Sequence, residues 1–319
     1  MKKHILTVSA NDTDIQFGQR VSELTGYDRA ALTDPEQISN YLIQNPRTLV
    51  LWDTDSAKPG SPSDLIMKIA PVLTAHTVPG RVFALSSVMI SQHPSLNKMP
   101  VFGHFLLKRY LDPAPLIYSK IIRASLLQHP FGLSNYFDSE TKVQRIELKK
   151  SLHKTAAVQA VENILSKRGI KGRISSLVAN AVDELLMNAI YDAPIDGDGV
   201  SYRREVDRNS DLELNDRELV RLEVAEAEKY IGVCISDQFG SLSKDVVLGF
   251  LRKDYQTSEY EAPKGKSGGL GLHGIVNAGL SMLLVSRPDF KTEVMIFFPK
   301  LPSYKDFKSG FRFISVVSY

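Results

Sequence analysis

Residues 175–198 constrain the fold of this chain more than any other stretch, because apolar and polar residues both repeat there with a helical period. The apolar stripe recurs at steps of three and four and predicts one buried helix face: Ile174, Leu177, Val178, Ala181, Leu185 and Ala189. Asn180, Glu184 and Asn188 form a polar stripe beside it.

A carboxylate and a carboxamide one helical turn apart suit chemistry at a phosphate. Glu184 can hold and deprotonate a water or a hydroxyl, and Asn188 can offer an oxygen to Mg²⁺. A solvated polar face on an ordinary core helix would carry the same stripe. This helix alone therefore leaves both interpretations open.

Two later segments that contain glycine favour phosphate chemistry. Residues 236–240 (SDQFG) follow the strand-like run YIGVCI, and residues 264–272 (KGKSGGLGL) precede a helical run. Glycines let backbone amides approach a phosphate closely, and the positive end of the following helix points at the same place. The three segments together indicate a nucleotide site.

These segments resemble the histidine-kinase-like ATPase superfamily, which holds gyrase-type, chaperone, mismatch-repair, histidine-kinase and anti-sigma ATPases. The resemblance is carried by ELLMN at 184–188, the family's asparagine box, by DQFG at 237–240 and by GGLGL at 268–272. It implies an α/β sandwich with a mixed, mostly antiparallel sheet over residues 169–300. It also implies ATP and Mg²⁺ as cofactors.

The resemblance assigns roles to single positions. Glu184 would be the catalytic base, Asn188 the Mg²⁺ ligand and Asp237 the acceptor of the adenine amino group, where guanine has a carbonyl. Residues 242–267 would form a lid whose lysines neutralise phosphate charge. The other implied nucleotide-binding residues are Asp192, Gly240, Lys264, Lys266, Gly268, Gly269, Leu270, Gly271 and Leu272.

The N-terminal part alternates short apolar strands with helical segments, which predicts a doubly wound parallel sheet. Asp53, Ser86 and Lys108 each stand at the carboxyl end of an expected strand, so we expect them to lie together. Residues 1–128 thus resemble a response-regulator receiver domain. Asp53 would be its phospho-acceptor, with Ser86 and Lys108 as partners.

This second resemblance is incomplete. Receivers carry an acidic pair after the first strand, where this chain has Ser9 and Ala10, with Asn11 and Asp12 just beyond. Arg109 stands where receivers usually have proline. Without the acidic pair, metal-assisted phosphorylation of Asp53 loses its main charge neutraliser. A degenerate receiver-like fold used for docking or dimerisation stays open as the alternative.

Four segments are expected: a receiver-like domain (1–128), a helical linker (129–168), an ATPase domain (169–300) and a C-terminal extension (301–319). The pattern predicts one long charged helix over residues 138–165 in the linker. This helix would act either as a connector between the domains or as a dimerisation surface. The tail FRFISVVS (311–318) has strand composition. It is expected at a sheet edge, against the first domain or against a partner chain.

Composition narrows the class of protein. A hydrophobic content of 43% and a charged content of 24% are typical of soluble globular proteins, and the net charge of +3 is not arranged as a nucleic-acid-binding stripe. No apolar run is long enough to span a membrane or serve as a signal peptide. Cys234, the single cysteine, is expected to be buried. We expect a cytoplasmic protein.

The leading hypothesis is a signalling protein that binds Mg-ATP for transfer of phosphate to serine or threonine of a partner protein, or for partner switching. The alternative is a non-catalytic module that responds to nucleotide; a homodimer is possible in either case. A histidine kinase is disfavoured, because none of the seven histidines is followed by an acidic residue and His153 is expected on the surface. A DNA-handling ATPase is disfavoured by length.

Overall fold

The computed structural model describes residues 3–55, 64–89, 103–110, 113–125, 130–243, 247, 268–301 and 303–318. The chain forms two compact units. The first comprises Met1–Pro130 with Phe311–Val316, and the second comprises Phe131–Gly310 with Val317–Tyr319. Both units combine helices with a β-sheet, so the protein belongs to the α/β class.

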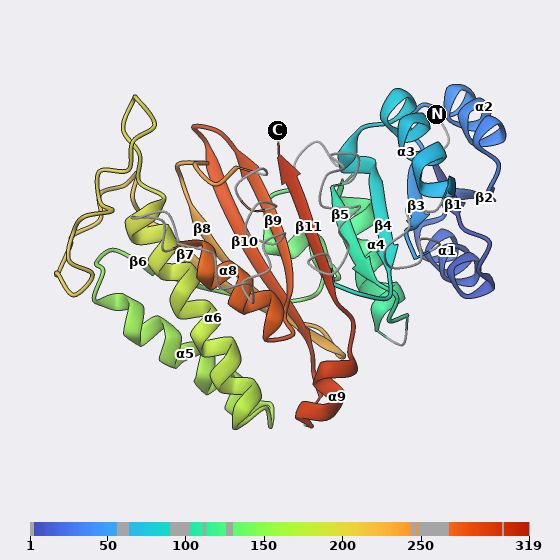
Figure 1. Ribbon diagram of the computed structural model, residues 1–319. Coiled ribbons are helices and arrows are strands. Elements are labelled where there is room, and N and C mark those ends of the chain that lie inside the picture. Colours follow the sequence, from blue (N-terminus) through green and yellow to red (C-terminus); the bar gives the residue numbers. More distant parts are fainter. Residues whose placement is uncertain are drawn as a thin grey trace, which may run out of the picture. The chain divides into compact units, whose positions relative to one another are not determined.

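The first unit contains a parallel sheet of β-strands in the order β2-β1-β3-β4-β5 (Figure 1). Its strands are β1 (His4–Val8), β2 (Asp28–Ala31), β3 (Leu49–Asp53), β4 (Val82–Ser86) and β5 (His104–Leu107). Its helices are α1 (Asp12–Thr25), α2 (Pro35–Gln44), α3 (Asp64–His76) and α4 (Ala114–Ser125). The predicted doubly wound arrangement is seen: α1 packs on α4 and α2 packs on α3, as right-handed crossovers require when the strand order reverses at β1.

Local sequence signals explain where these helices begin and end. The Asn11 side chain accepts the Thr13 N–H at the start of α1, and Gly26 ends that helix at a φ of 71°. Asp34 caps α2, which has Pro35 in its first turn. Strand β2 was not predicted from the sequence, because its four residues DRAA are mostly exposed and lack an apolar pattern.

The C-terminal tail adds a sixth strand to this sheet. Strand β11 (Phe313–Ser318) runs antiparallel to β5, with Phe313 opposite Leu106 and Ser315 opposite His104. The buried Ser315 hydroxyl and the His104 ring are hydrogen-bonded across the pair. The prediction of a strand in the tail is therefore confirmed. Among the expected positions, which were a sheet edge, the first domain or a partner chain, the structure shows pairing with the first unit.

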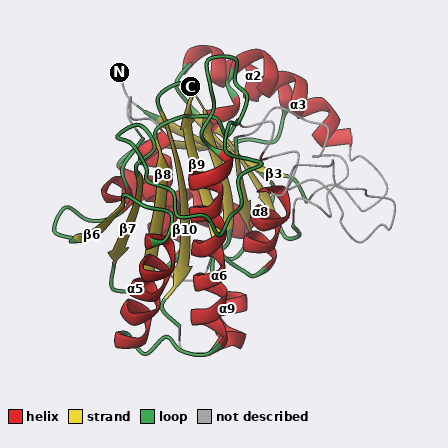
Figure 2. Cartoon of the chain, turned by 90° about the vertical axis from the view of Figure 1, so that its left-hand side faces the viewer, coloured by secondary structure: helices red, strands yellow, loops and turns green. Residues whose placement is uncertain are grey.

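The second unit contains an antiparallel sheet in the order β9-β10-β8-β7-β6. Its strands are β6 (Val143–Leu148), β7 (Val220–Glu226), β8 (Tyr230–Asp237), β9 (Ser281–Arg287) and β10 (Lys291–Pro299). Its helices include α5 (His153–Lys167), α6 (Arg173–Met187), α8 (Gly268–Asn277) and α9 (Tyr304–Ser309). Helix α6 packs between α5 and α8 over one face of the sheet (Figures 1 and 2).

The prediction of one long helix over residues 138–165 is wrong. The helical linker that rested on this prediction is therefore wrong as well. Residues 143–148 form β6, the outermost strand of the second sheet, and only then does α5 begin at His153. Val143 and Ile146 match a helical spacing, but the cross-strand partners Ala225 and Leu222 hold them in a sheet. His153 is exposed at the start of α5, as predicted.

The register of β8 divides its residues between the two faces of the sheet. Phe137 covers the opposite face from the helices, and it leaves no room for a side chain at Gly232. Alternation then places Val233, Ile235 and Asp237 on the helix face. Cys234 lies on the other face and is buried, as predicted.

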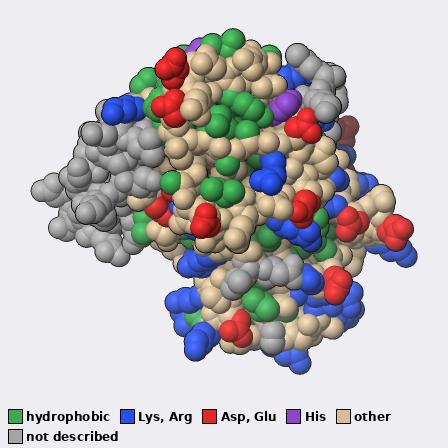
Figure 3. Space-filling view, turned by 90° about the vertical axis from the view of Figure 1, so that its right-hand side faces the viewer, with side chains coloured by type: hydrophobic (Ala, Val, Ile, Leu, Met, Phe, Trp, Pro, Cys, Tyr) green, Lys and Arg blue, Asp and Glu red, His purple; other side chains and the backbone are tan. Residues whose placement is uncertain are grey.

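Two predictions from composition concern membrane-spanning helices and the distribution of surface charge. In the described part of the chain, no helix is long and apolar enough to cross a membrane. On the face drawn in Figure 3, acidic and basic side chains both occur among neutral ones.

Candidate functional site

The polar stripe of α6 continues into a π-helical turn, Asn188–Asp192. The Ala193 N–H donates to the Asn188 carbonyl oxygen at 2.8 Å, which adds a residue to this turn. Such π-turns are frequent at functional sites. Of the predicted stripe, Glu184 and Asn188 are partly buried and Asn180 is exposed. Asp192, which only the family resemblance implied, is partly buried at the end of the π-helical turn.

The surroundings of Glu184 favour its protonated form. Burial raises its pKa above the ordinary value, and the neighbouring carboxylates Asp192 and Asp183 raise it further. Arg208 and a hydrogen bond from Asn188 work in the opposite direction. A carboxylate with a raised pKa is a better proton acceptor for a hydroxyl than an exposed one.

Two oxygen atoms of this cluster have no hydrogen-bond partner in the described structure, although both are buried: Asn188 Oδ1 and Asp192 Oδ2. Buried polar atoms are normally satisfied, so these two point to a missing group. Carboxamide and carboxylate oxygens are ligands that Mg²⁺ prefers. The residues present therefore fit the implied metal ion.

Arg208 is a site residue that sequence reasoning missed. Its guanidinium lies 3.8 Å from Asp192 Oδ2 and lowers the pKa of that carboxyl, which burial raises. The loop is anchored by the Tyr191 hydroxyl, which donates to the Arg208 carbonyl oxygen at 2.9 Å, and by the Ser151 hydroxyl, which donates to the Ser210 carbonyl oxygen at 2.7 Å. Arg208 lies in a stretch rich in charges of both signs, and no local signal marks it.

Asp237 ends β8 on the helix face and is buried. Its Oδ1 accepts the backbone N–H groups of Phe239 at 2.9 Å and Gly240 at 3.3 Å. Burial raises the pKa of Asp237 to about 6, against the lowering effect of those two amides. Gly240 has a φ of 68°, and a Cβ atom there would collide with the Arg287 carbonyl oxygen. Glycine is therefore required for this turn.

Thr292 is a second residue that the sequence did not reveal. It lies directly opposite Asp237 on β10, and its buried hydroxyl makes no hydrogen bond of normal geometry, although it is close enough to lower the pKa of Asp237. An ionised carboxylate can accept a hydrogen bond from an amino group, and a neighbouring free hydroxyl can donate one to a ring nitrogen. Together they match a ring whose amino group stands next to an acceptor nitrogen. Thr292 stands between Lys291 and Glu293 at the polar start of β10, so no local signal marked it.

The structure describes only part of the glycine-containing segment 264–272. Gly268, Gly269, Leu270, Gly271 and Leu272 form the first turns of α8, whereas the sequence had suggested a loop before the helix. Helix α8 packs on α6, and Leu272 is buried. Lys264, Lys266 and most of the expected lid lie outside the described residues.

In the first unit, the structure brings Asp53 and Lys108 into direct contact, as predicted. Lys108 Nζ donates to Asp53 Oδ1 at 2.6 Å. Ser86 joins this cluster through Asp55, because its hydroxyl donates to Asp55 Oδ1 at 2.9 Å. Asp55 Oδ2 lies 3.2 Å from Lys108 Nζ.

Asp14 supplies a carboxylate that the sequence had seemed to lack. It stands in the first turn of α1, is fully buried, and accepts from Lys108 Nζ at 2.8 Å and from the Tyr110 hydroxyl at 2.7 Å. Burial alone would lower the pKa of Lys108, but the hydrogen bonds to Asp14 and Asp53 raise it. Within the described residues, no group of three or more histidine, cysteine or acidic side chains is arranged to hold a metal ion.

Comparison with known proteins finds no matching family model and no matching curated protein.

Proposed function

We propose that this protein binds Mg-ATP in its second unit and uses it for phosphate transfer to a hydroxyl of a partner protein, or for partner switching, under the control of a receiver-like first unit. The histidine-kinase-like ATPase resemblance motivates the proposal. The observation that carries it is the pair of buried oxygens without hydrogen-bond partners in the described structure, on Asn188, one helical turn after Glu184, and on Asp192, at the end of the π-helical turn that follows. An ordinary solvated helix face would leave no such atoms.

Each side chain has one task in this proposal. Asp237 accepts a hydrogen bond from the adenine amino group, and Thr292 completes the polar edge beside it. Asn188 holds Mg²⁺ through its unsatisfied oxygen. Mg-ATP supplies the phosphate group that is transferred. Glu184 accepts the proton of the attacking hydroxyl, and its raised pKa suits that task.

The first unit favours a second candidate, a non-catalytic module in which nucleotide acts only as a conformational ligand. Lys108 is held by three carboxylates, those of Asp14, Asp53 and Asp55. Asp53 itself is buried, and its two carboxylate oxygens already accept hydrogen bonds from Lys108 Nζ and from the Ser9 hydroxyl, so neither is open to a phosphate donor. This observation bears on the first unit and leaves the ATP site unaffected.

Calorimetric titration of ATP with Mg²⁺ into the wild-type protein and into Asp237→Asn tests the binding step. We expect micromolar affinity that disappears in the variant, while Asp216→Asn, an exposed aspartate, binds as the wild type does. No binding by the wild-type protein would refute the proposal.

Transfer of labelled terminal phosphate to proteins of a lysate tests the chemical step. Glu184→Ala should bind ATP but transfer nothing, whereas Asn180→Ala, exposed on the same stripe, should be unaffected. If the ATP-bound wild-type protein labels no protein and releases no phosphate, the non-catalytic module is the correct description.

A further inference from the structure

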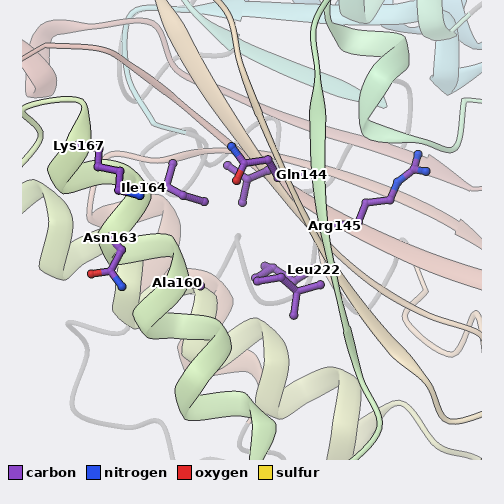
Figure 4. A pocket seen from close by; sticks show the side chains of 9 residues that line it. Gln144, Arg145, Ala160, Asn163, Ile164, Lys167 and Leu222 are labelled. Carbon is purple, nitrogen blue, oxygen red and sulfur yellow. The ribbon is translucent and has the colours of Figure 1, made fainter.

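A pocket of about 270 Å³ lies between α5 and the two outer strands of the second sheet, β6 and β7 (Figure 4). Its apolar lining comes from both layers: Ala160 and Ile164 on α5, and Ile146, Leu222 and Val224 on β6 and β7. The pocket forms because α5 packs mainly against α6 and makes far fewer contacts with β6.

The pocket opens beside a strand that has a partner on one side only. Strand β6 pairs with β7 and is the last strand of the second sheet in the described structure. Alternate backbone N–H and C=O groups of such an edge strand are directed outward and can pair with another extended chain. An added strand would lie next to the pocket opening, and every second side chain of that strand would face the same side as Ile146.

The rim of the pocket is polar and basic. Lys167 and Asn163 line it from α5 and Gln144 lines it from β6, whereas Arg145 extends to the other side of the strand and pairs with Glu223 at 2.5 Å (Figure 4). Lys142, Lys149 and Lys167 are exposed, and none of these three has an ion-pair partner among the described residues. Edge lysines discourage sheet aggregation, but that role does not explain an apolar pocket beside them.

We propose that this edge is a docking site for an extended, acidic segment of a partner protein, which adds to β6 and inserts an apolar side chain between Ile146 and Ile164. A pocket of about 270 Å³ with an apolar lining has room for an apolar side chain of such a strand. Charge complementarity supports the acidic character. On β6 itself the exposed Glu147 pairs with Arg221, so Lys142 and Lys149, unpaired within the described part of the chain, set the charge of this edge and disfavour pairing with a second copy. The inference is independent of the ATP site.

Methyl NMR of the full-length protein with labelled isoleucines tests the proposal. The probe is a short synthetic peptide in which glutamate and leucine alternate. We expect it to shift the methyl signals of Ile146 and Ile164. A peptide that alternates lysine and leucine should bind at least about tenfold more weakly, and one that alternates glutamate and serine should not bind.

Matched variants localise the binding. Ala160→Leu fills the pocket and should weaken binding of the glutamate–leucine peptide about tenfold, whereas Ala156→Leu, exposed one turn earlier on α5, should leave it unchanged. Lys167→Gln should weaken binding about threefold. Asp237→Asn should bind the peptide like the wild type, so that failure at the ATP site and failure at this edge are separable.

Three results would overturn the proposal. One is that neither isoleucine signal moves in the wild-type protein at millimolar peptide. Another is that decanoate shifts both signals as strongly as the peptide does, because a small anionic amphiphile is then the occupant. The third is self-association by sedimentation that Ala160→Leu abolishes, because a second copy then covers the edge.

Discussion

The affinity for adenosine should fall as the pH is lowered, because Asp237 accepts a hydrogen bond from the adenine amino group only when it is ionised. Burial raises the pKa of Asp237 to about 6, so this carboxyl titrates in a range where the protein can be studied. Adenosine is the informative probe, since it has the amino group but no phosphate. The raised pKa values of Glu184 and Asp192 would otherwise alter the binding of phosphate in the same pH range.

The magnitude follows from the ionised fraction. With a pKa of about 6, roughly nine-tenths of Asp237 is ionised at about pH 7 and roughly one-tenth at about pH 5. The dissociation constant for adenosine should therefore rise about tenfold between these pH values, which corresponds to about 1.4 kcal/mol. Binding should also release protons near pH 6, since the amino group stabilises the ionised form.

Inosine provides a matched control because it replaces the amino group by a carbonyl, which needs a protonated Asp237 as its donor. Its affinity should rise as the pH falls, in the direction opposite to adenosine. Competition against a fluorescent ATP analogue at each pH gives both dissociation constants. Equal affinities for adenosine at about pH 5 and about pH 7, or parallel trends for the two nucleosides, would refute the role of Asp237.

The same carboxyl should affect stability. A carboxyl whose pKa is raised in the folded state destabilises that state at pH values above the folded pKa, and the penalty disappears below the unfolded pKa. Asp237→Asn keeps an oxygen for the Phe239 amide, so it should raise the free energy of unfolding at about pH 7.5 by about 1–3 kcal/mol. Urea denaturation should show this gain shrinking steadily between about pH 6 and about pH 4.

Three further substitutions probe other parts of the structure. Gly240→Ala should cost about 1–3 kcal/mol and abolish nucleotide binding, because of its positive φ and the Arg287 carbonyl; Gly197→Ala, with open space around it, is the calorimetric control. Lys108→Met should destabilise the first unit by about 3–5 kcal/mol, because it leaves the buried carboxylates of Asp14 and Asp53 without their cation. Phe313→Ala should cost about 3–5 kcal/mol. Fluorescence of the buried Trp52, the single tryptophan, reports the unfolding of the Lys108→Met and Phe313→Ala variants. A midpoint equal to that of the wild type would contradict the prediction for that variant.

Secondary structure was predictable where the burial of an element requires a run or a regular spacing of apolar residues. Strands β1, β3, β4 and β5 and helix α6 were located from apolar runs or stripes, since each is buried on at least one face. Strand β2 was missed because its side chains are mostly exposed. Strand β6 was misread because an edge strand with alternating charges has the same composition as an exposed helix.

The candidate site shows the same division. Glu184 and Asn188 are one helical turn apart, so their spacing alone predicts that they lie together. Thr292, Arg208 and Asp14 come from other elements, and their contacts depend on strand register, on a loop anchored at Ser151, and on the packing of α1. No local pattern encodes such long-range placements.

The amino-acid sequence by itself therefore determined the class of the fold, the helix that carries the polar stripe and the positions where strands end on functional side chains. These properties follow from short-range periodicity and from the conformational preferences of glycine. Only the tertiary structure decided that β11 pairs with β5, that three carboxylates share Lys108, and that α5 leaves a pocket beside β6. Each of these results from side chains that are distant in the chain and meet only when the sheets are assembled.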